Sequence, residues 1–67
     1  MPWNAYRYPA AMSLLRPAVR AKAIEIANAL LREGNDEGRA IRIGISRAKL
    51  WAEQRQRDAG TARRGWT

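Results

Sequence analysis

The clearest pattern in the chain is an apolar stripe with helical spacing between residues 17 and 33. At about 100° per residue, its apolar side chains share one arc and most of the polar ones share the other. The apolar set is Val19, Ala23, Ile24, Ile26, Ala27, Leu30 and Leu31, and the polar set is Lys22, Glu25, Asn28 and Arg32. Pro17 suits a first helical turn, because the N–H that proline lacks is unpaired there anyway. The pattern predicts an amphipathic helix over residues 17–33.

A second apolar stripe predicts another helix over residues 37–56. Its positions are Ala40, Ile41, Gly44, Ile45, Ala48, Trp51 and Ala52, several of them small enough to let a neighbouring helix approach closely. Between the two helices, Gly34 suits a left-handed cap, and Asn35 and Asp36 supply the next N-cap. Because this linker is short, it predicts an antiparallel helical hairpin.

The segment before the hairpin contains prolines and aromatic residues. Pro9 can start a short helix over residues 9–15, and Arg16 should end it, because a residue that precedes proline avoids the α region. The aromatic side chains are Trp3, Tyr6 and Tyr8. We expect them to cover the apolar groove of the hairpin. The alternative is that they stack on nucleic-acid bases or on a planar ligand.

These elements predict an all-α fold, a small three-helix domain over residues 1–56 in which the short helix packs on the long hairpin. After Gln56 the apolar rhythm stops, which predicts a flexible, disordered basic tail over residues 57–67. The 67 residues contain no cysteine, so packing alone must hold the domain together.

The formal net charge of +7 favours anionic partners. No stretch reaches the roughly 20 apolar residues of a membrane span, and no leader is visible at the start, so we expect a cytoplasmic protein without membrane insertion. A row on the face opposite the buried stripe carries Arg39, Arg42, Ser46 and Lys49. This row suits phosphate contacts and predicts nucleic-acid binding. The alternative is an ordinary solvated face, since Glu53 continues the row and dilutes its charge.

Two large apolar residues, Ile43 and Leu50, lie seven positions apart on another side of the same predicted helix. Such a pair can form a partner interface or the seam of a weak homodimer. Alternatively, the N-terminal segment folds over them and the protein is a monomer.

Catalysis is not expected from this sequence. Histidine and cysteine are absent, so the hydroxyl groups of Ser13, Ser46 and Thr61 have no partner to activate them. The acidic residues Glu33, Asp36 and Glu37 are explained by helix capping rather than by a metal site. We therefore expect a non-enzymatic protein with no cofactor and no metal.

Several separated motifs resemble the YdaT family of small bacterial proteins, and the likeness covers about residues 1–52. They are the opening Met-Pro-Trp, Tyr8-Pro9-Ala10-Ala11-Met12, Leu15, residues 19–31, Glu33-Gly34, residues 36–41, Ala48-Lys49 and Trp51-Ala52. A fainter likeness is to ChaB-type proteins. The resemblance implies a small helical cytosolic protein, in some members linked to general stress responses, and it transfers no catalytic residue. The chain departs from the family's usual pattern at Arg42, Gly44 and Leu50.

Overall fold

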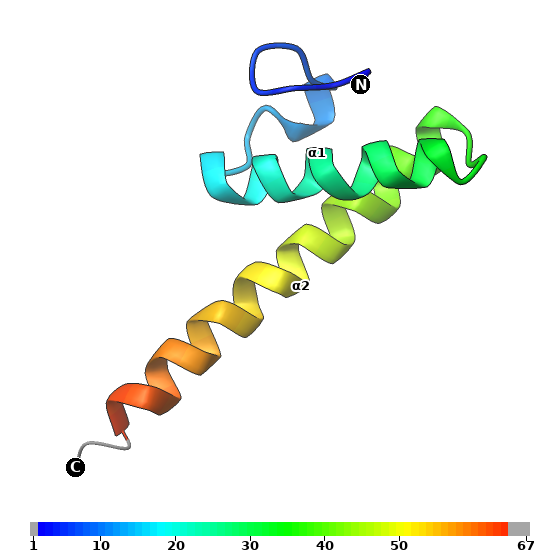
Figure 1. The fold of residues 1–67 in the computed structure, drawn as a ribbon. Coiled ribbons are helices and arrows are strands. Elements are labelled where there is room, and N and C mark those ends of the chain that lie inside the picture. The colour runs from blue at the N-terminus through cyan, green and yellow to red at the C-terminus, as the bar shows by residue number, and fades with distance from the viewer. Residues whose placement is uncertain (1, 65–67) are drawn as a thin grey trace.

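The structure is a computed structural model that describes the backbone of residues 2–64 and the side chains of residues 2–58. Its elements in chain order are a 3-10 turn, η1 (Ala10–Met12), and two α-helices, α1 (Pro17–Arg32) and α2 (Glu37–Arg64). The described residues contain no β-strand. The predicted all-α class is therefore confirmed, with two helices rather than three (Figure 1).

The boundaries of α1 follow the sequence signals. Arg16 is extended, with φ −60° and ψ 149°, and Pro17 occupies the first turn. At the other end the Glu33 N–H donates to the Ala29 and Leu30 carbonyls, both at 3.1 Å. Gly34 then takes a φ of +99°, in the left-handed region that favours glycine. The predicted helix and its glycine cap are both present, with α1 ending one residue earlier than expected.

The start of α2 is capped by Asp36. Its Oδ1 accepts a hydrogen bond from the Arg39 N–H at 2.8 Å, which satisfies a donor that the first helical turn leaves unpaired. Glu37 adds a carboxylate to that first turn, where the helix dipole favours negative charge. Asn35 ties the turn back to α1, because its Nδ2 donates to the Leu30 carbonyl at 3.0 Å.

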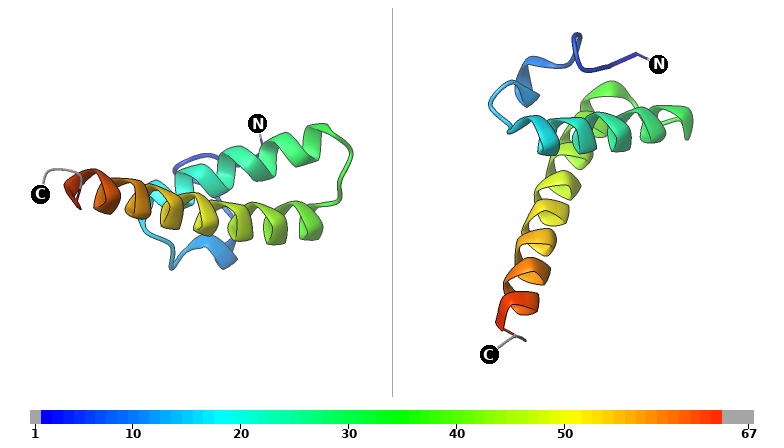
Figure 2. Two further views of the ribbon diagram at one scale, coloured as in Figure 1. Left: turned by 90° about the horizontal axis from the view of Figure 1, so that it is seen from below. Right: turned by 60° about the vertical axis from the view of Figure 1, so that its left-hand side comes forward.

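The two α-helices meet beside the connecting turn and diverge from there, instead of lying along each other as the predicted antiparallel hairpin (Figures 1 and 2). The reason lies in the spacing of their small residues. Ala23 and Ala27 on α1 are four positions apart, as are Ala40, Gly44 and Ala48 on α2. Ridges with this spacing interlock at a steep angle of about 50°, whereas a near-antiparallel pair needs a different pairing of ridges.

Gly44 is the point of closest approach between the helices. A Cβ atom built there would lie 2.9 Å from the Ala23 carbonyl oxygen and 3.1 Å from the Ala27 Cβ. Only glycine leaves room for two backbones at this distance. The core around this crossing consists of Met12, Ala23, Ile24, Ala27, Leu30, Ala40 and Ala48.

The N-terminal segment, residues 2–16, lies over α1 and the beginning of α2 (Figure 1). The helix predicted over residues 9–15 is reduced to η1. Ser13 helps to end it, because both its N–H and its Oγ hydroxyl donate to the Ala10 carbonyl, at 3.0 Å and 2.7 Å. Met12 is nevertheless fully buried, so this short turn still supplies the core.

Asn28 corrects the predicted polar side of α1. It is only 3% exposed, and its Nδ2 donates to the Trp3 carbonyl at 3.0 Å. The N-terminal segment therefore covers a part of α1 that periodicity assigned to solvent. The Asn28 Oδ1 atom is also buried, and it accepts no hydrogen bond from the described residues. Burying an acceptor without a partner costs free energy, which offsets part of what the Nδ2 hydrogen bond contributes.

α2 continues through Arg64, eight residues beyond the predicted end at Gln56. Residues 57–64 are thus helical in this structure rather than the predicted tail. Alanine and arginine, which make up five of these eight residues, are good helix formers, and Gln54 Nε2 donates to Asp58 Oδ1 at 3.5 Å one turn on. This part of α2 extends away from α1 (Figure 1). The predicted tail residues 65–67, including Trp66, lie outside the described part of the chain.

Candidate functional site

The four residues of the predicted basic row all lie exposed on one side of α2, which we call the outer face: Arg39, Arg42, Ser46 and Lys49. On the opposite side, Ala40, Gly44 and Ala48 are buried against α1 and form the inner face. The separation follows from helical geometry, because the two sets occupy different arcs of the same turns. The packing of α2 on α1 thus leaves the outer face open to solvent.

The cations of the outer face differ in whether they already form hydrogen bonds within the protein. Arg39 belongs to the helix cap, since its Nε donates to Asn35 Oδ1 at 3.1 Å in addition to its backbone bond with Asp36. Within the described part of the chain, Arg42 and Lys49 form neither a hydrogen bond nor an ion pair. These two side chains are therefore the ones that a phosphate group could engage without breaking an existing contact.

A shallow depression of about 520 Å³ lies on this side of α2. It is lined by Arg42, Ile45, Ser46, Lys49, Leu50 and Glu53. Two cations, a hydroxyl group and apolar surface suit an anionic ligand with some apolar character. The Glu53 carboxylate lines the same depression as these two cations.

Ile43 and Leu50, the predicted apolar pair, have different environments. Ile43 is partly buried and packs against the core. Leu50 is 62% exposed and borders the depression beside Lys49. Of the two, only Leu50 therefore exposes most of its side chain to a partner.

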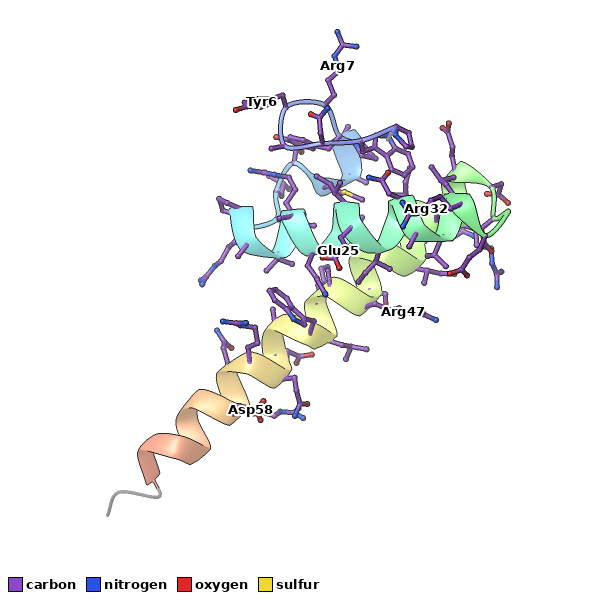
Figure 3. All side chains as sticks on the ribbon, viewed as in Figure 1. Tyr6, Arg7, Glu25, Arg32, Arg47 and Asp58 are labelled. Atoms are coloured by element: carbon purple, nitrogen blue, oxygen red, sulfur yellow. The ribbon has the colours of Figure 1, made fainter. Side chains whose placement is uncertain are left out.

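The aromatic residues of the N-terminal segment also differ in their environments. Trp3 and Tyr8 pack against the core, and the guanidinium of Arg20 lies 4.6 Å from the centre of the Tyr8 ring. Tyr6 is 93% exposed and, like Arg7, points away from both helices (Figure 3). The predicted covering role is therefore confirmed for Trp3 and Tyr8.

Trp51 lies at the edge of the helix crossing rather than inside it. Its ring is partly buried and has two cations nearby, Lys22 Nζ at 5.5 Å and the Arg55 guanidinium carbon at 5.1 Å from the ring centre. Lys22 also pairs with Glu25 at 3.5 Å. Sequence periodicity placed Trp51 on the buried stripe, and these cations at the rim were not predicted.

Neither helix, over the residues that the structure describes, is long and apolar enough to cross a membrane.

The chain is similar to a known bacterial protein. The chain is 53% identical over 58 residues to the uncharacterized protein YdaT of Bacillus subtilis (strain 168). The matched region is 87% of this chain and 39% of the relative, so the chain spans about two fifths of the relative's length. No family model and no solved structure matches.

Proposed function

Because this chain belongs to a YdaT-like family of unknown function, we propose a function from its surface: a non-enzymatic module that binds nucleic acid through the outer face of α2. The observation that supports the proposal is the exposure of Arg39, Arg42, Ser46 and Lys49 on one side of a single helix. The net charge of +7 favours the same class of partner.

Binding of this kind rests on phosphate contacts. Arg42 and Lys49 supply the main charges, and Ser46 between them donates a hydroxyl hydrogen bond to a phosphate oxygen. The outer face presents no asparagine or glutamine in the row, the side chains that read adenine. The proposal is therefore for binding with little sequence preference. Arg55, Arg57, Arg63 and Arg64 add non-specific attraction.

Titration against duplex and single-stranded DNA and RNA at two salt concentrations tests this proposal. The double variant Arg42→Glu, Lys49→Glu should abolish measurable binding or lower the magnitude of the salt slope by about 2, one unit for each lost phosphate contact. Arg7→Glu is the matched control, because Arg7 is exposed but points away from α2 (Figure 3). Absence of binding at low salt, absence of a salt slope, or an equal loss in Arg7→Glu would reject the interface.

The exposure of Leu50 favours a second candidate, a protein-interaction or self-associating module. In this version Leu50 is the main contact and the half-buried Ile43 contributes its exposed edge. Sedimentation of the wild-type protein beside Leu50→Glu distinguishes the candidates. A concentration-dependent dimer that the substitution dissolves supports self-association, whereas a monomer at all concentrations eliminates it.

The family resemblance also motivates a cytoplasmic, stress-associated role. If this part of the proposal is correct, the abundance of the protein in its native cells rises when growth is halted by heat, salt or starvation. An unchanged abundance under all three conditions would remove stress association and leave the binding proposal untouched.

A further inference from the structure

An open groove separates the diverging helices on the side away from their connecting turn. It encloses about 550 Å³. One wall is formed by Leu14, Leu15, Arg16 and Val19, and the other by Lys49, Ala52, Glu53 and Gln56 of α2. We call it the wedge groove. It exists because the small residues at the crossing set the helices at a steep angle, so nothing from the described chain fills the wide end.

The wedge groove carries the most exposed leucine of the described chain. Leu14 is 97% exposed, in the turn that leads from η1 to α1. Leu15 and Val19 beside it are half-buried, and Ala52 faces them from α2. Leu14 in this position contributes nothing to the core, and its exposed side chain beside Leu15, Val19 and Ala52 leaves apolar surface available to a partner.

The charges around the wedge groove are mainly positive. Arg16 stands on one wall and Lys49 on the other, with Glu53 as the only acid among the lining residues. Beyond Lys49 lies Arg42, in the depression that shares Lys49 and Glu53 with the groove. A complementary partner must therefore present apolar side chains flanked by carboxylates.

A second copy of this chain does not meet that requirement. The exposed stretch of α2 beyond Glu53 carries Arg55 and Arg57 beside Asp58 and is not acidic. The formal net charge of +7 further disfavours a second copy at this positively charged groove.

We propose that the wedge groove binds an acidic amphipathic helix of another protein. A third helix would fill the space between two splayed ones, with leucine or isoleucine anchors at i, i+3 or i+4, and i+7 against Leu14, Leu15 and Val19. Its carboxylates would meet Arg16 and Lys49. This site goes beyond the nucleic-acid proposal, and because both use Lys49, the two partners compete.

The test begins with a displayed library of helical peptides in which the apolar anchors are fixed and the flanking positions are random. Selection on the full chain should enrich aspartate and glutamate at the flanks. The best acidic peptide should then bind Leu14→Glu at least about tenfold more weakly than wild type. Tyr6→Glu is the matched control, since Tyr6 is 93% exposed and lies outside the groove, and it should bind like wild type.

Circular dichroism should show both variants folded, because neither side chain is buried. Leu14→Glu should keep its nucleic-acid affinity, whereas Arg42→Glu should weaken nucleic acid and retain the peptide. The peptide-binding proposal and the nucleic-acid proposal can therefore fail independently of each other. The proposal is overturned if selection yields no binder, or binders whose flanking positions are basic. It is also overturned if Leu14→Glu and Tyr6→Glu lower the peptide affinity equally, or if Leu14→Glu weakens only binding to vesicles of anionic phospholipid.

Discussion

The inner and outer faces of α2 belong to the same turns of one helix and have opposite chemistry. The inner face is built from small residues and lets the backbone of α1 come within contact of Gly44. The outer face carries long cationic side chains, two of which engage nothing in the described chain. The difference shows how a very small domain can keep folding and recognition apart: each substitution on one face should leave the other nearly untouched.

The largest effect should come from the inner face. Gly44→Leu places a side chain where even a Cβ would lie 2.9 Å from a backbone oxygen, so the helices must separate. We expect a loss of about 3 kcal/mol or more, comparable with the whole stability of a domain this small. Chemical denaturation followed by circular dichroism measures it.

Gly38→Ala is the control for this substitution. Its Cβ would meet only the Asp36 Oδ1 at 3.5 Å and the Arg42 Nη1 at 3.9 Å, which are ordinary contacts. Since alanine favours the helix over glycine, this variant should be stabilised by up to about 1 kcal/mol. Comparable stability of Gly44→Leu and wild type would mean that the helices do not cross where the structure places them.

Trp51→Ala tests how much the partly buried ring at the edge of the helix crossing contributes to stability. A tryptophan truncation in a full core removes about 3–5 kcal/mol, but Trp51 is only partly buried, so we expect about 2 kcal/mol. The same denaturation experiment applies. An unchanged midpoint would assign the Trp51 ring to the binding surface, and a loss at the upper end of the core range would place it inside.

Asn28→Ala removes a hydrogen bond between α1 and the N-terminal segment. We expect a loss of about 1–2 kcal/mol, because the Trp3 carbonyl loses its buried donor. Asn4→Ala is the comparison, since Asn4 Oδ1 accepts its bonds from Tyr6 and Arg7 in an exposed turn, where water can replace it. That variant should change stability by less than about 0.5 kcal/mol. Equal effects would show that burial of Asn28 does not matter.

The smallest effect on stability should come from ending the chain after Asp58. The removed part of α2 extends beyond the helix crossing (Figure 1), so the free energy of unfolding should change by less than about 0.5 kcal/mol. Affinity for nucleic acid should fall, because Arg63 and Arg64 are lost with it. A marked drop in the melting temperature would contradict the view that this stretch lies outside the folding unit.

Local signals in the sequence predicted local structure well. Pro17, Gly34 and Asp36 define the ends of α1 and the start of α2, because each acts through its own backbone or that of its neighbours. Periodicity also identified the inner and outer faces of α2. These features depend on one helix at a time.

What the sequence did not predict depends on two segments at once. The steep crossing follows from small residues on both helices, and neither stripe alone distinguishes it from an antiparallel pair. Asn28 is a polar residue on a helix, and its burial is explained only by the N-terminal segment, whose Trp3 carbonyl accepts its hydrogen bond. The wedge groove likewise arises only when Leu14 and Lys49 face each other across diverging elements.

The division of α2 into a packing face and a binding face is tested most directly by amide chemical-shift mapping during titration with the oligonucleotide that binds most tightly. The largest shifts should fall at Arg42, Ser46 and Lys49, while the signals of Gly44 and Ala48 stay nearly constant. Largest shifts at the aromatic N-terminal segment or around Trp51, or loss of the Gly44 and Ala48 signals on binding, would contradict it.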